Sequence, residues 1–452
     1  MGKITLRQAA DWCGGRVDPI YEDVEFLGAN MDSRGIQPGQ LFIALEGARD
    51  GHDFIPMAME KGAAAVLCKH CAAGIPAIIV DDPRIALGRI AHGERHRIGM
   101  KVVGVTGSVG KSTTKEMIAC VLDGSYRVAK TPANHNNDIG MPMAILSMPE
   151  DTELAVLEMG MNHFREIAYL TKIANPDAAV IINIGTMHIE HLGSQEGILE
   201  AKLEITEGMA PDAPLFLNGD DALLRTAPER VDQSITYFGQ LRPNTAVVVS
   251  DVHQTSEHLS FRVTYGKEIF SIELPLEGSH YVPDALAAIA VGLAMGVSVA
   301  DIQQRLSAFR NLAGRQEILE QKGYTIIKDC YNAGPESMSA ALRVLGAKPG
   351  RHIAVLGDML ELGVRTQAEH YRVGRIAAEN ADYVLAYGPN ARRVVSGART
   401  GGMADHHALD FEDRNQLVAT LQRLARPGDV LLFKGSHGMH MELALEKFLK
   451  EV

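Results

Sequence analysis

The sequence has no excess of positive charge. Its 44 lysines and arginines are outnumbered by 56 aspartates and glutamates, which gives a net charge of −12. Proteins that bind nucleic acids or membrane surfaces usually carry a basic patch, so this balance argues against both functions. Apolar runs are short as well, and none approaches the ~18 uncharged residues of a membrane-spanning helix. We therefore expect no nucleic-acid partner and no stable membrane insertion.

Cysteine is also scarce, with five in 452 residues. An odd number of cysteines in a long chain favours reduced thiols over a disulfide framework. Cys68 and Cys71 have C-x-x-C spacing, but a zinc site needs a second ligand pair, so we interpret both as packing or surface groups. The first residues, MGKITLRQAADW, form no long apolar run. We expect no secretory signal there and a cytoplasmic location.

The chain is long enough for several domains, at roughly 100–200 residues each. Its apolar content of 46% is ample for their cores. The order of strand and helix patterns predicts three α/β domains, with boundaries at 1–85, 86–312 and 313–452. The first is small, and the second carries a parallel sheet of the nucleotide-binding type. In the third, strands alternate with helices as in a doubly wound, Rossmann-like sheet.

The stretch KVVGVTGSVGKSTTKEMIACVL, residues 101–122, organises the second domain. Residues 102–105 have the pattern of a buried strand, a loop with two glycines follows, and a helical pattern begins at Lys111. This order is typical of a phosphate cradle, in which loop N–H groups and the helix N-terminus face the anion. The lysine reaches the β- and γ-phosphates and the next hydroxyl binds Mg²⁺. The predicted phosphate loop consists of Thr106, Gly107, Ser108, Val109, Gly110, Lys111, Ser112 and Thr113.

One feature of this loop differs from the standard pattern G-x-x-x-x-G-K-[ST]. That pattern would need a glycine at Val105, and the nearest glycines are Gly104 and Gly107. The alternative interpretation is a glycine-rich turn in an ordinary βαβ unit. The agreement of strand, loop, lysine, hydroxyl and helix in order favours the phosphate loop.

Polar side chains follow two other strand patterns of this domain. Glu158 closes the apolar run 154–157, and an acid at the end of a strand beside a phosphate loop typically binds the metal. A carboxylate at such a place is costly unless it is paired. His188 lies in the segment after the predicted strand 178–184, where we expect one histidine to face the nucleotide.

Two further groups have an ordinary structural interpretation. Lys202 lies between Glu200 and Glu204 in a helical pattern, which locally indicates a solvated ion pair. Residues 131–142 are rich in amides, whose paired donors and acceptors suit a sugar or peptide, and suit turns and helix caps equally well. The candidates in that loop are Asn136, Asn137 and Asp138.

The first and third domains offer polar turns as well. In the first, the segments 32–34 and 50–53 are turns whose side chains either form a polar site on neighbouring loops or are simply solvated; the candidates are Ser33, Arg34, Asp50 and His52. In the third, polar residues follow predicted strands, at the edge where ligands bind in open α/β sheets; these are Asp329, Tyr331, Asn332, Asp358 and Lys434. Arg315 lies at the junction of the last two domains, where an arginine reaches a bound γ-phosphate.

Together these motifs resemble those of the Mur ligases, the ATP-dependent amide-bond-forming enzymes of peptidoglycan precursor synthesis. Residues 106–113 are similar to the shortened phosphate loop of that family. The resemblance covers all three domains and includes NNDIGMP (136–142), DCYNAGPESM (329–338), GDMLELG (357–363) and KGS (434–436). It indicates the member that joins D-alanyl-D-alanine to UDP-N-acetylmuramoyl-tripeptide. The Asp-Asn-Pro-Arg motif of the sister enzyme that adds the third residue is not found.

The resemblance also implies cofactors, substrates and residue roles. The cofactors are ATP and Mg²⁺, with a second Mg²⁺ joined by a carbamylated Lys202, and the substrates are the UDP-sugar tripeptide and D-alanyl-D-alanine. We expect a monomer. The implied catalytic residues are Lys111, Lys202, Arg315 and His188. The implied ATP contacts are residues 106–113, Arg315 and Asp329. The implied metal ligands are Ser112, Glu158, His188 and Lys202. The implied substrate contacts are Ser33, Arg34, Asp50, Gly51, His52, Asn136, Asn137, Asp138, Tyr331, Asn332 and Ser337.

One departure and two alternatives remain at this point. The family usually shows His-Asn-x-x-Asn before an alanine-rich helix, where this chain has Tyr281 and Asp284 in place of the two asparagines. A related ligase, of folylpolyglutamate or cyanophycin synthesis, is one alternative, and comparing UDP-sugar tripeptide with folate as substrate separates them. A P-loop switch or partner-binding ATPase is the other, and it predicts nucleotide binding without amide formation.

Overall fold

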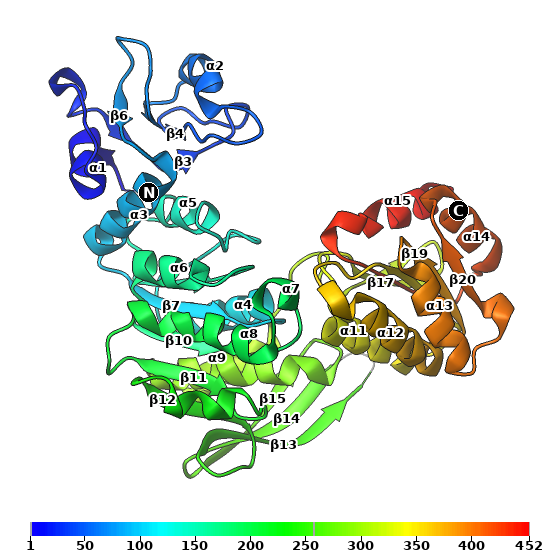
Figure 1. Cartoon of the computed structure of the whole chain (residues 1–452). Helices are drawn as coiled ribbons and strands as arrows, with labels where there is room; N and C mark the ends of the chain where they lie inside the picture. Colours follow the sequence, from blue (N-terminus) through cyan, green and yellow to red (C-terminus); the bar gives the residue numbers. More distant parts are fainter. Residues whose placement is uncertain (1, 256–257, 452) are drawn as a thin grey trace.

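The computed structural model describes residues 2–255 and 258–451, which build three successive α/β domains (Figure 1). The first domain lies at one end of the central domain, and the third domain stands beside the central domain. This arrangement confirms the predicted fold class. No helix in the described ranges is long and apolar enough to cross a membrane.

The first domain is built on a four-stranded parallel sheet of order β3-β4-β5-β6. Its first helix begins after Thr5, whose hydroxyl accepts a hydrogen bond from the Gln8 N–H, and it ends at Gly14 with φ +72°. The elements are β1 (Ile4–Thr5), α1 (Leu6–Cys13), η1 (Pro19–Tyr21), β2 (Glu25–Phe26), β3 (Ala29–Asn30), β4 (Leu41–Ile43), η2 (Gly51–Phe54), α2 (Ile55–Glu60), β5 (Ala65–Cys68) and β6 (Ala77–Ile79).

The helix α3 (Pro83–Ile98) connects the first domain to the central one. Asp82 caps its start, and the helix contacts α1 on one side and α5 (Gly140–Leu146) on the other. One apolar cluster runs from Leu6 through Leu87 and Ile90 of α3 to Met141. The first domain is therefore attached by a shared apolar core. The predicted boundary between residues 85 and 86 falls in the first turn of α3 and stays a prediction.

The central domain has a nine-stranded sheet of order β15-β14-β13-β12-β11-β10-β7-β9-β8. Seven strands, β7 to β13, pair in parallel as predicted, whereas β14 and β15 are antiparallel. The elements are β7 (Lys101–Thr106), α4 (Lys111–Leu122), β8 (Val128–Lys130), β9 (Leu154–Glu158), α6 (Glu166–Ala174), β10 (Ala178–Ile181), α7 (Ile189–Leu192), α8 (Gln195–Leu203), η3 (Glu204–Gly208), β11 (Pro214–Asn218), η4 (Leu224–Glu229), β12 (Ser234–Gln240), β13 (Thr245–Gln254), β14 (Leu259–Tyr265), β15 (Glu268–Leu274), η5 (Ser279–Tyr281), α9 (Val282–Ala294) and α10 (Val299–Ser307).

The strand that leads into the phosphate loop lies inside this sheet. β7 pairs with β9 on one side and β10 on the other. Its consecutive residues Val102 and Val103 point to opposite faces of the sheet and belong to two different apolar cores. Helices α5, α6 and α8 cover one face, and α4, α9 and α10 cover the other. Because β7, β9 and β10 run in parallel, the residues that follow their carboxyl ends meet at one edge of the sheet.

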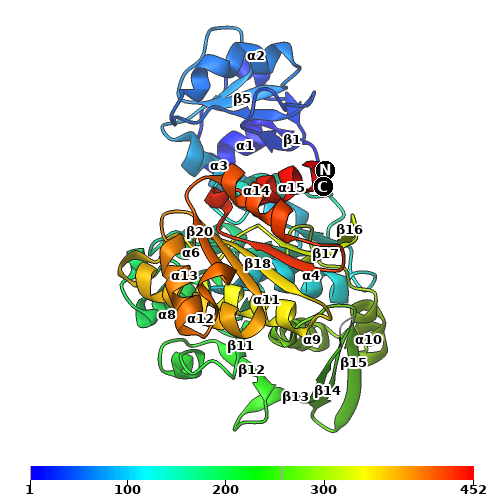
Figure 2. The ribbon, with the colours of Figure 1, turned by 90° about the vertical axis from the view of Figure 1, so that its right-hand side faces the viewer.

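The third domain has a six-stranded sheet of order β16-β17-β21-β18-β19-β20 (Figure 2). Its first strand is antiparallel and the other five are parallel, with α11, α12 and α13 on one face and α14 and α15 on the other, which confirms the doubly wound prediction. The elements are β16 (Glu317–Gln321), β17 (Tyr324–Asp329), α11 (Pro335–Ala347), β18 (His352–Gly357), η6 (Gly363–Arg365), α12 (Thr366–Asn380), β19 (Tyr383–Tyr387), α13 (Ala391–Thr400), η7 (Asp405–His407), β20 (Ala408–Phe411), α14 (Arg414–Leu424), β21 (Val430–Lys434), η8 (His437–Met439) and α15 (Met441–Glu451).

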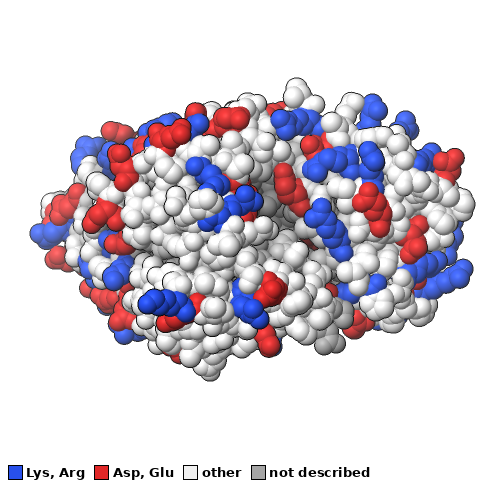
Figure 3. Space-filling model, turned by 90° about the horizontal axis from the view of Figure 1, so that it is seen from below, with Lys and Arg blue, Asp and Glu red and all other residues white. Residues whose placement is uncertain are grey.

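Charged side chains of both signs are interspersed on the face of the molecule shown in Figure 3.

Candidate functional site

A cavity of about 610 Å³ lies between the central and third domains. Residues 108–113 of the phosphate loop line one side of it, and residues that follow β17 of the third domain line another. The predicted site residues that line it outside the loop are Asn136, Glu158, His188, Arg315, Asp329, Tyr331, Asn332, Ser337 and Lys434. The structure thus brings together side chains from two domains that are distant in sequence.

The phosphate loop has the backbone of an anion site. Gly110 has φ +84° and forms the N-cap of α4, and no side chain caps the N–H groups of the first helical turn. Lys111 begins that turn, and its ammonium donates hydrogen bonds to the carbonyl oxygens of Gly107, at 2.9 Å, and Ser108, at 3.4 Å. Burial lowers the pKa of Lys111, and the nearby Arg315 adds to that effect while Glu158 opposes it. Thr106 and Gly107, the first two residues of the loop, do not line the cavity.

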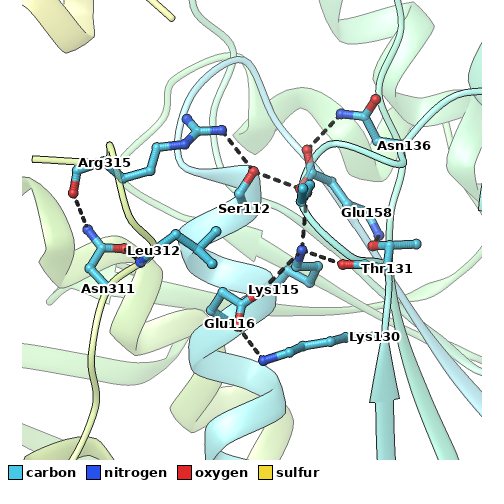
Figure 4. Close-up of polar contacts among 11 residues, drawn as sticks. Ser112, Lys115, Glu116, Lys130, Thr131, Asn136, Glu158, Asn311, Leu312 and Arg315 are labelled. Atoms are coloured by element: carbon cyan, nitrogen blue, oxygen red, sulfur yellow. Dashed lines mark hydrogen bonds and ion pairs between the residues drawn. The ribbon is translucent and has the colours of Figure 1, made fainter. Parts of the chain in front are cut away.

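Ser112, the residue after Lys111, forms an oxygen pair with Glu158 (Figure 4). The Ser112 hydroxyl donates to Glu158 Oε2 at 2.8 Å, and Arg315 donates to the same hydroxyl at 3.1 Å. Asn136 donates to Glu158 Oε1 at 2.8 Å. Glu158 is buried but has two polar partners, as the cost of burying a carboxylate requires. A hydroxyl and a carboxylate within 3 Å are the ligand types that Mg²⁺ prefers.

Asn183 holds the phosphate loop, and the sequence reasoning did not select it. Its Oδ1 accepts hydrogen bonds from the N–H groups of Ser108, at 3.0 Å, and Val109, at 2.9 Å. Its Nδ2 donates to the Val109 carbonyl oxygen at 3.0 Å. One side chain therefore fixes the first half of the loop. Its position just after β10, the strand beside β7, is the signal by which it could have been found.

Asp284 lies directly behind Gly110 and stands where the family pattern has asparagine. The Thr114 hydroxyl donates to Asp284 Oδ1 at 2.7 Å, and a Cβ at Gly110 would lie 2.5 Å from the same oxygen. Burial raises the pKa of Asp284 to about 7. Tyr281, at the other departure, accepts a hydrogen bond from Asn311 at 2.9 Å. In the sequence, Asp284 could have been recognised as the single acidic residue in the otherwise apolar pattern of α9.

Lys202 lies on α8 and its side chain is 2% exposed. Within residues 2–255 and 258–451 its ammonium has no hydrogen-bond or ion-pair partner. Burial, and then the charge of Lys111, hold its pKa well below the usual range. The residue is outside the lining of the cavity but within electrostatic reach of the phosphate loop. Because this side chain is buried, the solvated ion pair that the local pattern predicted is wrong.

Charged and aromatic groups of the third domain complete the cavity. Asp329 pairs with the buried ammonium of Lys434 at 2.6 Å, and Lys434 also donates to the Asn332 carbonyl oxygen at 3.0 Å. The guanidinium carbon of Arg315 lies 3.7 Å from the ring centroid of Tyr331, which is a cation–π contact. Ser337 caps the start of α11 by accepting from the Gly334 N–H at 3.0 Å.

His188 joins the two domains at the rim of the cavity. It is the N-cap of α7, with φ +63°, and its Nδ1 lies 2.7 Å from Glu361 Oε2 of the third domain. The contact with His188 lowers the pKa of Glu361.

The remaining predicted contacts lie away from the cavity lining. Asn137 caps α5 by accepting from the Gly140 N–H at 2.7 Å, and Asp138 pairs with Arg84 of α3. In the first domain, both predicted turns adjoin α2. Ser33 donates to the sulfur of Met57 at 3.4 Å, and Arg34 pairs with Asp32 at 2.9 Å.

The second of these turns is held by its own hydrogen bonds. His52 Nδ1 contacts Asp50 Oδ1 at 2.6 Å, and its Nε2 accepts from the Lys69 N–H at 3.0 Å. Gly51 is required because a Cβ there would lie 2.6 Å from backbone atoms of Leu45. Substrate roles for these first-domain residues stay predictions.

Comparisons with known proteins extend over the same three regions. Residues 105–292 match the Mur ligase middle domain, residues 314–437 the Mur ligase, glutamate ligase domain, and residues 25–95 the Mur ligase family, catalytic domain. The UDP-N-acetylmuramoyl-tripeptide–D-alanyl-D-alanine ligase of Bacillus subtilis (strain 168) is 40% identical, over 98% of this chain and 97% of the relative.

Two crystal structures are similar throughout their length. MurF from Acinetobacter baumannii superposes with a TM-score of 0.90 at 30% identity, covering 100% of this chain and 99% of that one. MurF ligase from Thermotoga maritima in complex with ADP superposes with a TM-score of 0.83 at 30% identity, covering 94% and 97%. From these matches, and from the phosphate loop and paired oxygens described above, we conclude that the chain belongs to the Mur ligase family.

Proposed function

We propose that this chain is an ATP-dependent, ADP-forming ligase that joins D-alanyl-D-alanine to UDP-N-acetylmuramoyl-tripeptide in cytoplasmic peptidoglycan precursor synthesis. The observation that carries the proposal is the cavity lined by the phosphate loop of the central domain and by the strand ends of the third domain. The name of the Bacillus subtilis relative and the ADP bound to the Thermotoga maritima enzyme support it.

The reaction begins with a phosphoryl transfer. A carboxylate is a poor acyl donor because its oxygen leaves badly, so the tripeptide carboxylate attacks the γ-phosphorus of ATP and becomes an acyl phosphate, and ADP leaves. Two anions must approach each other in this step, and Lys111, Arg315 and the N–H groups at the start of α4 neutralise the developing charge. Arg315 stacks on Tyr331 and bonds to Ser112, so its position is set before substrates bind.

The donor set near the phosphate loop fits Mg²⁺. Ser112 and Glu158 would hold it, with His188 as a further candidate and a carbamylated Lys202 beside a second ion; bound there, Mg²⁺ supplies neutralising charge to the phosphates. The buried, unpaired amine of Lys202 supports carbamylation, since the neutral amine is the form that adds CO₂ and burial lowers the pKa of this group.

The second half of the reaction involves the third domain. The free amine of D-alanyl-D-alanine attacks the acyl carbon, and the tetrahedral intermediate expels phosphate. We assign Tyr331, Asn332 and Ser337 to the dipeptide and Asp329 to the ribose of ATP, and all four residues line the cavity. Water would hydrolyse the acyl phosphate, so we expect the third domain to close over the site and exclude water. The first domain, through Ser33, Arg34 and residues 50–52, would hold the uridine end. We assign residues 1–85, 86–312 and 313–452 to the three domains of a monomer.

The test measures phosphate release with ATP, UDP-sugar tripeptide and D-alanyl-D-alanine, omitting each in turn, with the product mass checked. The complete mixture should be required, and D-alanine alone should be a poor substitute. A site built for a second amide and a carboxylate leaves those groups unpaired with the shorter amine, at about 1–3 kcal/mol each. Discrimination should therefore be about 10- to 100-fold or more. Equal rates with D-alanine, or ligation of a free amino acid to a shorter UDP-sugar peptide, would assign this chain to another step.

A further inference from the structure

The central and third domains meet along a polar seam at the rim of the cavity. The seam consists of residues 186–190 of the central domain and residues 336 and 361–363 of the third. Thr186 donates to Glu336 Oε1 at 3.1 Å, and His188 Nδ1 lies 2.7 Å from Glu361 Oε2. The two apolar cores of the third domain are composed of residues from 318 onward. The polar contacts across this seam therefore depend on how the third domain is placed against the central domain.

The segment that carries Glu361 is fixed to the third domain. The buried side chain of Asp358 accepts hydrogen bonds from the backbone N–H of Asn390 at 3.1 Å and from its side chain at 2.7 Å. Leu360 donates its N–H to the Ser436 hydroxyl at 2.9 Å, which ties the segment to the end of β21. Glu361 itself has φ +63°, which is uncommon for a residue other than glycine. The position of this carboxylate is thus set by the third domain, and it moves with that domain.

His188 has the opposite attachment. It follows β10 of the central domain, lines the cavity, and also has a left-handed backbone, with φ +63°. Its side chain is 13% exposed, whereas that of Glu361 is 48% exposed. Because Nδ1 faces Glu361, the nitrogen left for a ligand in the cavity is Nε2. A carboxylate that holds one ring nitrogen of a histidine fixes the tautomer and the ring orientation.

We propose that Glu361 is a positioning residue of the ligase: from the third domain it contacts His188 of the central domain across the seam, and it orients the imidazole toward the reacting groups. In this way the seam couples the position of the third domain to the orientation of the His188 ring. The expected effect on turnover rests on the proposed function. The expected effect on the hydrogen exchange of residues 186–192 rests on the seam contacts alone.

The experiment compares Glu361→Ala, which removes the contact with Nδ1, with Glu361→Gln, which keeps an oxygen at the same place and removes the charge. Glu379→Gln is the matched control, because Glu379 is an exposed acid on α12 of the same domain and lies outside the seam. We expect Glu361→Ala to lower kcat by about 10- to 100-fold with little change in the KM for ATP. Glu361→Gln should recover most of that loss, and the control should match wild type.

A second measurement does not depend on turnover. Amide hydrogen exchange of residues 186–192 should be faster in Glu361→Ala than in wild type and the control, with and without ADP. If Glu361→Ala keeps the kcat and the exchange rates of the control, or if Glu361→Gln is as defective as Glu361→Ala, the positioning role is wrong. If wild type itself does not ligate, the proposed function fails, whereas the exchange comparison still decides whether the contact exists.

Discussion

The Thr114 hydroxyl donates a hydrogen bond of 2.7 Å to Asp284 Oδ1, and this pair lies directly behind Gly110 of the phosphate loop. The pair connects α4, which starts the loop's helix, to α9 on the same face of the sheet. An uncompensated carboxylate in such a place is costly, and the pKa of Asp284 is raised by burial to about 7. We therefore expect the charge of Asp284 beside Gly110 to change with pH near neutrality.

This arrangement predicts the pH dependence of folding stability. The pKa of Asp284 is about 7 in the folded chain and near the ordinary 3.8 when unfolded, so the folded state binds more protons between these values. Its contribution to stability is present at low pH and is lost as the pH rises from about 4 to about 7. Asp284→Asn keeps an oxygen for Thr114 and removes the charge. Its free energy of unfolding should exceed that of wild type by an amount that grows with pH.

Denaturant unfolding of both proteins at several pH values between 5 and 8.5 tests this expectation. Asp212→Asn, at an exposed acid, is the control and should leave the pH profile unchanged. A constant difference between Asp284→Asn and wild type across this range would contradict the raised pKa.

Asn183 should be required for nucleotide binding. Asn183→Ala leaves the Val109 N–H without its side-chain partner, at a cost of about 1–3 kcal/mol where it stays buried, whereas the Ser108 N–H keeps the main-chain carbonyl oxygen of residue 183 at 3.1 Å. Asn183→Asp keeps the accepting oxygen, but it loses the donor to Val109 and adds a negative charge beside the triphosphate. Both variants should bind ADP more weakly in calorimetry, with the aspartate variant at least as weak. The affinity for the UDP-sugar tripeptide serves as the internal control, and an equal loss there would indicate general unfolding instead.

Local patterns predicted some of these residues and not others. The order Gly110-Lys111-Ser112 after an apolar strand is a local signature, and so is an acid such as Glu158 at the end of a strand. Asn183 and Asp284 act on the loop from segments about 75 and 170 residues away, so only the packing of β10 and α9 against it reveals them. β14 and β15, by contrast, pair across a two-residue turn at Gly266 and Lys267, so their antiparallel pairing is a local hairpin feature.

Lys111→Ala should abolish ligation while the fold is retained. The lysine's charge matters most when a phosphate is being transferred, and losing such a contact costs about 2.7–4 kcal/mol of transition-state stabilisation, or roughly 100- to 1000-fold in kcat. Phosphate release is the assay, and an unchanged thermal transition shows that folding is intact. Activity within a few-fold of wild type would contradict the assignment of residues 106–113 to the phosphates.

The local sequence around Lys202 predicts an exposed lysine, whereas the structure buries this side chain. Glu200 and Glu204 flank it in sequence, yet the side chain is 2% exposed and has no partner in the described ranges. A buried, unpaired ammonium is unfavourable, so the neutral amine is favoured, and that form adds CO₂ to give a carbamate and a proton. Lys202→Ala should be nearly inactive and be partly rescued by small carboxylates such as acetate or formate. Lys267→Ala, at an exposed lysine, should match wild type, since exposed charges contribute about 0–1 kcal/mol. Carbon-13 NMR of wild type in labelled bicarbonate should show a carbamate signal that Lys202→Ala lacks. Normal turnover of Lys202→Ala would mean that this lysine only fills space.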